Sequence, residues 1–329
     1  MTTTMTEPPA TAAAAPGTPP KAVKRLGDRI FSGTALGSGI VILVTLAAVA
    51  LFLVIQSLPA FQSDTTDNNI LKGESFWTWV GPIVFGTVWA AAIALVVATP
   101  IALGIALFIS HYAPRKLAGV IGYVIDLLAA VPSVVFGLWG ALTFAPVLVP
   151  FYKWLNQNLG WIPIFAVDEG TAPSGSGKTI LTAALVLAVM ILPIMTAICR
   201  EIFLQTPKLH EEAALALGAT RWEMIRMAVL PFARSGIVSG AMLGLGRALG
   251  ETMAVAMVLA PSSLVTFQLL STVNPSTIPA TIALRFPEAH GDGTATLVAA
   301  GLILFVVTFA VNFLARWIVA RRAEFSGAN

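Results

Sequence analysis

Long apolar runs alternate with shorter polar stretches along almost the whole chain. Each run exceeds the ~20 residues that an α-helix needs to cross the hydrocarbon core of a bilayer. The runs cover about residues 31–57, 82–112, 117–150, 179–204, 231–260 and 294–320. The pattern therefore predicts six transmembrane helices, with both chain termini on one side of the membrane. The third run is long enough to begin with a stretch that lies on the membrane surface.

The composition is that of a membrane protein. The chain is 57% hydrophobic and only 11% charged, whereas soluble domains carry about 25% charged residues. A chain with so few charged residues does not have enough polar side chains to cover a surface that faces water, so lipid must surround most of it. Because Cys199 is the one cysteine, no disulfide can form within the chain. We therefore expect an all-α polytopic membrane protein.

The distribution of basic residues predicts how the chain is oriented. Residues 1–24 are rich in Thr, Ala and Pro and show no apolar periodicity, so we expect them to form a disordered cytoplasmic tail. The predicted transmembrane domain then covers residues 25–329. With the N-terminus in the cytoplasm, most of the 19 Lys and Arg residues fall in cytoplasmic segments, which is the positive-inside pattern. The predicted outer loops, about 58–81, 151–178 and 261–293, then hold Lys72, Lys153, Lys178 and Arg285.

One stretch, "TAPSGSGKTI" at residues 171–180, nearly matches the phosphate-binding loop G-x-x-x-x-G-K-[ST], with Ala172 in place of the first glycine. Such a loop needs a strand before it and a helix after it, so that backbone N–H groups surround the phosphates. No alternating βα pattern surrounds this stretch, and the predicted topology places it outside, away from cellular ATP. We interpret it as a Gly/Ser-rich turn with a snorkelling Lys178, and expect the purified chain to hydrolyse no ATP.

The longest cytoplasmic segment contains a predicted helical hairpin at residues 205–231. Thr206 suits the N-cap of its first helix, and Gly218 suits a left-handed residue at the end of that helix. The sequence "TRWE" then predicts a capping box that starts at Thr220. Pro231 is expected to begin the fifth transmembrane helix. On the residues alone, the hairpin is either a docking element for another protein or an amphipathic loop on the membrane surface.

The hairpin sequence "EAALALG" at 212–218, followed by "LP" at 230–231, resembles the EAA motif of binding-protein-dependent ABC importer permeases. That motif is E-A-A-x-x-x-G, nine variable residues and I-x-L-P, and Ala228 stands where the family often has isoleucine. The resemblance implies a type I importer permease fold, also called MetI-like, whose hairpin is a coupling helix that docks on a separate ATPase subunit. It assigns this coupling to Glu212, Ala213, Ala214 and Gly218.

Two further stretches, "GRALGETMAVAMV" at 246–258 and "LLAAVPSVVFGLWG" at 127–140, resemble the C-type permease subunits of phosphate transport systems. The resemblance implies a non-catalytic subunit that carries inorganic phosphate across the bacterial cytoplasmic (inner) membrane and needs no cofactor. It also implies three partners: a homologous A-type permease, a dimer of ATPase subunits and an extracytoplasmic phosphate-binding protein. Membrane lipid surrounds such a subunit, and no nucleic acid is involved.

Arg247 and Glu251 are charged residues inside a predicted membrane helix. Arg247 would lie about 18 Å into that helix at ~1.5 Å per residue, near the middle of a ~30 Å core. Their i, i+4 spacing puts both on one helix face, so they can pair. They either fix helix packing as a buried pair or line the substrate path, where a guanidinium offers bidentate donors to phosphate.

Asp126 and Ser133 are weaker candidates for the same path. Asp126 lies near the point where the third helix enters the bilayer, and interfacial capping or pairing explains it without a role in transport. Ser133 follows the helix-breaking Pro132, where freed backbone groups can face a central cavity.

Three alternative functions stay open at this point. Permeases for other oxyanions, such as sulfate or molybdate, share the coupling motif. An ion-gradient secondary transporter would show repeated halves, and no clear self-similarity relates the first three helices to the last three. A membrane-bound nucleotide enzyme would use residues 172–179. No metal site is predicted, because the remaining candidate ligands have no suitably spaced partners: Cys199, His111, His210 and His290.

Overall fold

The structure, a computed structural model, describes residues 26–62, 68–167, 173–262 and 264–323 of the chain. The tail predicted at residues 1–24 lies outside the described residues. The chain divides into two compact units, Met1–Leu51 and Phe52–Asn329. The first unit contains the N-terminal part of α1 (Leu26–Gln62), and the second contains every later helix.

Six helical stretches among the described residues are long and apolar enough to cross a membrane. They are Gly27–Phe61, Phe76–Tyr112, Ser133–Leu159, Ile180–Leu204, Arg221–Leu249 and Asp292–Trp317. The prediction of an all-α protein with about six such helices is confirmed, and the chain is a multi-pass membrane protein. The third stretch, Ser133–Leu159, begins within the apolar run predicted at 117–150 and extends beyond its end.

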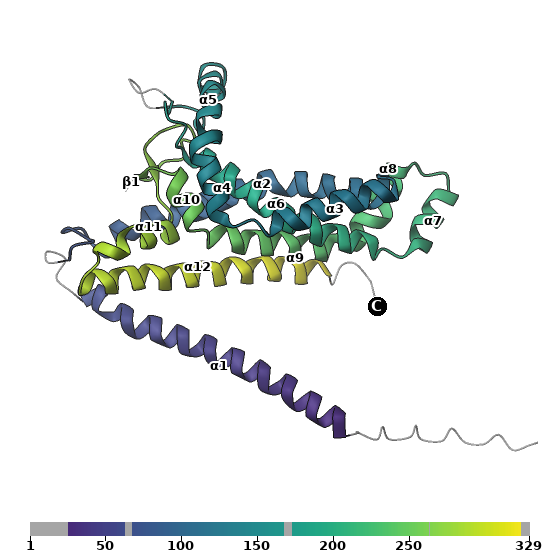
Figure 1. The fold of residues 1–329 in the computed structure, drawn as a ribbon, viewed down its shortest axis with the longest axis horizontal. Coiled ribbons are helices and arrows are strands. Elements are labelled where there is room, and N and C mark those ends of the chain that lie inside the picture. Colours follow the sequence, from purple (N-terminus) through teal and green to yellow (C-terminus); the bar gives the residue numbers. More distant parts are fainter. Residues whose placement is uncertain (1–25, 63–67, 168–172, 263, 324–329) are drawn as a thin grey trace, which may run out of the picture. The chain divides into compact units, whose positions relative to one another are not determined.

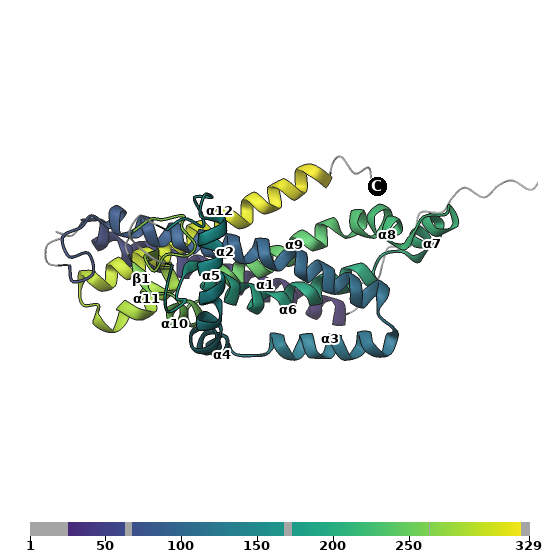
Figure 2. The ribbon, with the colours of Figure 1, turned by 90° about the horizontal axis from the view of Figure 1, so that it is seen from above.

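The centre of the second unit consists of α2 (Phe76–Leu107), α6 (Ile180–Leu204) and α9 (Leu230–Leu249), which run side by side (Figures 1 and 2). Small side chains at four-residue spacing on α2 let neighbouring helices approach closely. They are Ala90, Ala94, Ala98, Ala102 and Ala106, each at most 1% exposed. Larger residues of α6, among them Ile191 and Met195, are fully buried in the same core. α12 (Asp292–Ala323) packs on α9 and α2.

The apolar run at 117–150 forms two helices separated by a turn. α3 (Arg115–Ala129) packs along α6, and α4 (Ser133–Trp139) continues through a π-turn at Gly140–Phe144 into α5 (Ala145–Leu159). α5 runs across the direction of α2, α6 and α9 (Figure 1). The prediction of one helix is wrong because Pro132 lacks an N–H and disfavours helical geometry in the residue before it. The start of the run, where a surface-lying stretch was expected, forms α3, which runs alongside α6 (Figure 2).

Glycines let α4 and its π-turn lie directly against α10 (Met253–Val258) and α6. A Cβ at Gly137 would lie 2.7 Å from Ala254 Cα, and a Cβ at Gly140 would lie 2.6 Å from a Val186 methyl group. Both distances are shorter than a normal contact between carbon atoms. Any larger residue at either glycine would therefore push these helices apart.

The predicted hairpin consists of α7 (Lys208–Ala216) and α8 (Arg221–Met224). Two of its predicted features are confirmed. Gly218 follows α7 with φ +84°. In the capping box, Thr220 N donates to Glu223 Oε2 at 2.8 Å, and Glu223 N donates to Thr220 Oγ1 at 3.3 Å. Reciprocal capping fixes the start of α8 and so the direction in which the chain re-enters the bundle.

One other expectation about the hairpin is wrong. Pro207, not Thr206, occupies the N-cap of α7, and the Thr206 hydroxyl is buried without a hydrogen-bond partner among the described residues. Pro231 lies in the first turn of α9, as expected, but α9 continues from α8 through a π-turn at Ile225–Val229. Proline inside a helix clashes with the carbonyl four residues before it. A π-turn just ahead of the proline shifts the hydrogen-bond register by one residue and accommodates it.

The segment between α10 and α12 forms short elements at the end of the bundle opposite the hairpin (Figure 1). They are β1 (Pro261–Ser262), β2 (Asn274–Pro275), which pairs with β1 in parallel, α11 (Ile278–Arg285) and a 3-10 turn at Phe286–Glu288. Ile278 N donates to Thr87 Oγ1 of α2 at 2.9 Å. A Cβ at Gly86 of α2 would collide with the Ser276 carbonyl oxygen. Much of the loop expected at 261–293 is thus an ordered segment attached to α2.

Residues 173–179, the described part of the stretch that resembles a phosphate-binding loop, form a packed turn at the start of α6. Thr179 is the N-cap of that helix, and its fully buried hydroxyl accepts a hydrogen bond from Thr182 N at 3.2 Å. Ser174 N donates to Leu270 O at 3.0 Å. No strand leads into the turn within the described residues 151–167 and 173–179. The interpretation as a Gly/Ser turn is confirmed, because its polar groups serve capping and packing.

Gly177 is the position in this turn that tolerates substitution least. It has φ +71°, and a Cβ there would collide with the Ala145 carbonyl. We predict that Gly177→Ala lowers the free energy of unfolding by about 1–3 kcal/mol, because alanine is strained in the left-handed conformation. The measurement is the thermal unfolding midpoint of the purified chain in detergent. Gly175→Ala is the matched control, since a Cβ at Gly175 meets no atom within 4 Å, and equal midpoints for both variants would contradict the predicted strain.

Candidate functional site

A break between two helices positions one of the predicted path residues. α9 ends and α10 begins on either side of residues 250–252. Glu251 is 9% exposed, and its Oε1 accepts a hydrogen bond from Ala254 N at 3.1 Å. The carboxylate therefore caps the start of α10, where the partial positive charge of unpaired N–H groups favours an anion.

Arg247 lies in the last turn of α9 and is half-buried. The predicted pairing with Glu251 is wrong: the helix ends before Glu251, the i, i+4 geometry is lost, and no ion pair joins these two described residues. The partial negative charge at the end of α9 favours a cation at this position. Arg247 Nε is buried and finds no hydrogen-bond partner among the described residues. The described part of the chain thus leaves a buried guanidinium donor unsatisfied.

No hydrogen bond or ion pair among the described residues joins the other two path candidates to Arg247. Asp126 is exposed on α3. Ser133 is the half-buried first residue of α4, the helix that packs on α10. Sequence reasoning missed the helix break itself, although a glycine followed by polar residues at 250–252 is a usual signal of a helix end and a new cap.

Three of the four predicted coupling residues belong to α7, and the fourth, Gly218, follows its end. Glu212 and Ala213 are exposed, and Ala214 is half-buried. Two apolar residues beside them, Leu209 and Leu217, are 76% and 90% exposed. Apolar side chains gathered on an exposed hairpin are typical of a surface that binds another protein.

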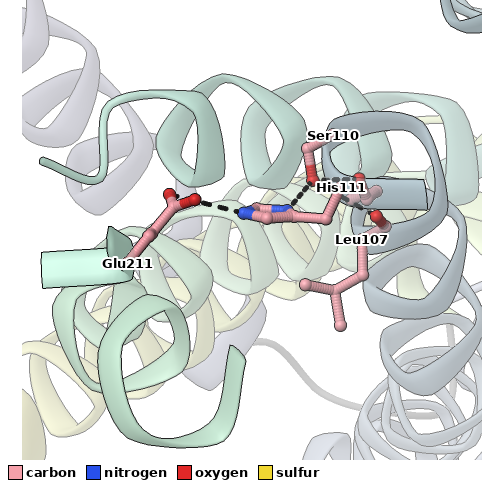
Figure 3. A network of polar contacts seen from close by, with 5 residues as sticks. Leu107, Ser110, His111 and Glu211 are labelled. Carbon is pink, nitrogen blue, oxygen red and sulfur yellow. Dashed lines mark hydrogen bonds and ion pairs between the residues drawn. The ribbon is translucent and has the colours of Figure 1, made fainter. Parts of the chain in front are cut away.

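The opposite face of α7 contacts the end of α2. Glu211 Oε1 lies 3.6 Å from His111 Nε2, a contact that becomes an ion pair when the imidazole is protonated, and Ser110 Oγ lies 2.7 Å from His111 Nδ1, as Figure 3 shows. Ser110 Oγ also donates to Ala106 O of α2 at 2.8 Å. Sequence reasoning missed this network because Glu211 and His111 are far apart in the chain and follow no motif spacing. Among the described residues, no cluster of His, Cys, Asp and Glu could hold a metal ion.

Residues 98–324 match the protein family described as "Binding-protein-dependent transport system inner membrane component". The chain belongs to this family. The matched region begins within α2 and contains the hairpin, the helix break at 250–252 and α12. The resemblance inferred from the EAA motif is therefore confirmed.

Relatives with curated names are similar to the chain over nearly its whole length. It is 42% identical over 316 residues to the "Phosphate transport system permease protein PstC 2" of Mycobacterium tuberculosis, which covers 91% of this chain and 94% of the relative. It is 40% identical over 311 residues to the "Phosphate transport system permease protein PstC" of Mesorhizobium japonicum, covering 92% and 93% of the two chains. The resemblance to C-type phosphate permeases is confirmed by these relatives.

A solved bacterial ABC transporter, "involved in the import of the acidic polysaccharide alginate", contains a chain of similar fold. That chain is 15% identical, the similarity covers 90% of this chain and 96% of that one, and the TM-score is 0.59. At this identity the likeness concerns the fold alone. Together with the family match, it confirms the predicted type I, MetI-like permease fold.

The capping role of Glu251 predicts different effects for two substitutions. Glu251→Gln keeps a side-chain oxygen that can accept from Ala254 N, whereas Glu251→Ala leaves this buried N–H unpaired, at a cost of about 1–3 kcal/mol. We expect the alanine variant to unfold at a clearly lower temperature than the glutamine variant in detergent. If both variants lowered the midpoint equally, the charge of Glu251 and not its cap would be what stabilises the break.

Proposed function

We propose that the chain is a permease subunit of an ATP-binding-cassette importer that carries inorganic phosphate across the bacterial cytoplasmic membrane. The observation that carries the proposal is the 42% identity over 316 residues to a relative named as a phosphate transport permease. Other named relatives down to 37% identity have the same designation. A permease for sulfate or molybdate, or an ion-gradient transporter, is not favoured by these relatives.

ATP hydrolysis belongs to separate subunits in this proposal. The Gly/Ser turn at 173–179 uses its backbone for packing, so it offers no nucleotide site. The exposed face of α7, with Glu212, Leu209 and Leu217, suits docking on an ATPase subunit. A dimer of such subunits would hold this hairpin and the equivalent hairpin of a homologous permease. The chain itself then acts as a non-catalytic binding and gating subunit.

The proposed orientation places the hairpin and both termini in the cytoplasm. The end of α2, the start of α3, the end of α6 and the hairpin lie at one end of the bundle (Figure 1). Basic residues gather in those segments: Arg115, Lys116, Arg200, Lys208, Arg221 and Arg226. This is the distribution that cytoplasmic segments of membrane proteins have. The opposite end, with β1, β2 and α11, would then meet an extracytoplasmic phosphate-binding protein.

Arg247 is the residue that we place on the phosphate path. Its buried Nε has no acceptor among the described residues, and leaving such a donor unpaired is costly. A phosphate oxygen would satisfy it, and a guanidinium binds phosphate with paired hydrogen bonds. Glu251 is engaged with the α10 N-terminus, so it shapes the break beside Arg247 and limits how tightly an anion is held. We keep Ser133 as a candidate on the α4 side of the path, and Asp126 as a candidate at its rim.

Uptake assays test both the function and the role of Arg247. The chain, its partner permease, the ATPase subunits and the binding protein are reconstituted in liposomes, and ATP-dependent uptake of labelled phosphate is compared with uptake of sulfate and molybdate. We expect phosphate uptake, and we expect Arg247→Gln to lower it at least about tenfold through loss of a charge-assisted hydrogen bond. Assembly should stay intact, as measured by co-purification of the ATPase subunits.

Arg234→Gln is the matched control, because Arg234 lies on the same helix and is exposed. It should transport at the wild-type rate. Normal uptake by Arg247→Gln would remove Arg247 from the path while leaving the function in place. Absence of phosphate uptake by the wild-type complex, with uptake of another oxyanion, would contradict the proposed substrate.

A further inference from the structure

Two adjacent glutamates on α7 face in different directions. Glu212 is exposed, whereas the Glu211 side chain is 23% exposed and points at His111 (Figure 3). Ala214, three residues after Glu211, is the other half-buried residue of α7. Positions i and i+3 share a helix face, so Glu211 and Ala214 define the inner face of α7, and Glu212 belongs to the outer face.

The inner face meets α2 where that helix changes its hydrogen-bond pattern. Residues Phe108–Tyr112 form a π-turn that extends α2, and Ala113 N closes it by donating to Phe108 O at 2.7 Å. His111, 9% exposed at its side chain, lies in this turn between Glu211 and Ser110. Because Ser110 is bonded to the Ala106 carbonyl, a force on the imidazole acts on the backbone of α2 and not on a freely rotating ring.

α2 also has fixed contacts in its N-terminal half. Thr87 accepts from Ile278 N at 2.9 Å, and Gly86 lies against the Ser276 carbonyl. Along a helix, Thr87 and His111 are about 36 Å apart at ~1.5 Å per residue. One continuous element therefore connects the hairpin at one end of the bundle with the segment at 274–278 at the other.

We propose that Glu211 and His111 are positioning residues that pass movement of the hairpin to α2, and through α2 to the segment at 274–278. The inference rests on the proposed function, in which ATPase subunits move the hairpin. It divides the two glutamates by role: Glu212 faces the ATPase subunit, and Glu211 holds the membrane helix. Losing the Glu211–His111 contact should leave docking intact and separate ATP hydrolysis from transport.

The test uses the complete transporter in liposomes, with phosphate uptake and ATP hydrolysis measured on the same preparation. In Glu211→Ala and in His111→Ala we expect the ATPase subunits to co-purify normally and hydrolysis to continue. The number of phosphate ions transported per ATP hydrolysed should fall about tenfold, a change of the size that coupling between two sites usually produces. The double variant should be no worse than either single one, because both remove the same contact.

Two controls match these variants. Glu212→Ala makes the same substitution one residue along the same helix, and it should reduce co-purification of the ATPase subunits. His290→Ala removes an exposed histidine after α11, at the other end of the bundle, and should leave co-purification of the ATPase subunits unchanged. Alanine favours helix at both glutamate positions, so loss of helix propensity does not distinguish them.

A thiol probe reports directly on the far end of α2. Thr272→Cys places a thiol on an exposed residue just before the segment at 274–278, and the native Cys199 is buried, so the new thiol dominates labelling. We expect ATP to change the labelling rate of Thr272→Cys in the otherwise wild-type complex, and this change to disappear when Glu211→Ala is added. This readout needs no phosphate transport.

The inference is overturned if Glu211→Ala transports phosphate with wild-type coupling, or if it loses the ATPase subunits as Glu212→Ala does. Double-variant effects that multiply, or an ATP-dependent change in labelling that persists in Glu211→Ala, overturn it as well. Failure of the proposed function has a different signature, which is a wild-type complex that takes up no phosphate.

Discussion

Inside a bilayer, a helix can be interrupted only where the protein itself satisfies the freed N–H and C=O groups. Two interruptions in this chain meet that requirement. At 250–252 the Glu251 carboxylate accepts from Ala254 N. At 130–132 the N–H groups of Ala130 and Val131 donate to carbonyls three residues back, and Pro132 has no N–H to satisfy. Because both breaks are capped, α4 and α10 exist as short helices that pack on each other through Gly137.

The same constraint accounts for the surroundings of Arg247. If α9 continued without a break, Arg247 and Glu251 would lie one turn apart and neutralise each other. Because of the break, Glu251 lies at the N-terminus of α10 and Arg247 lies at the C-terminal end of α9. Each charge then lies at a helix end whose dipole favours it. Among the described residues, Arg247 is thus retained without an ion-pair partner, which suits transient binding of an anion better than a closed ion pair does.

The hairpin illustrates how one short helix can serve two surfaces. Its outer face carries exposed apolar residues and Glu212, and its inner face carries Glu211 and Ala214. Two π-turns border it: Phe108–Tyr112, whose His111 contacts Glu211, and Ile225–Val229, which leads from α8 into α9. π-turns are uncommon and occur frequently at functional sites. Their position on either side of the hairpin fits an element that transmits movement.

The sequence by itself determined the class of protein, the number of long apolar helices and the hairpin with its Gly218 end and Thr220 cap. These features depend on composition and on contacts between residues close in the chain, which local patterns report. The EAA motif likewise identified the family, because its residues lie in one continuous stretch. Hydropathy could not separate α3 from α4–α5, since both halves of the run are equally apolar. Only the tertiary structure decided that Glu251 caps α10 instead of pairing with Arg247, and that Glu211 reaches His111. Those outcomes depend on where helices end and on which distant segments pack together, and neither is recorded in the spacing of residues along the chain.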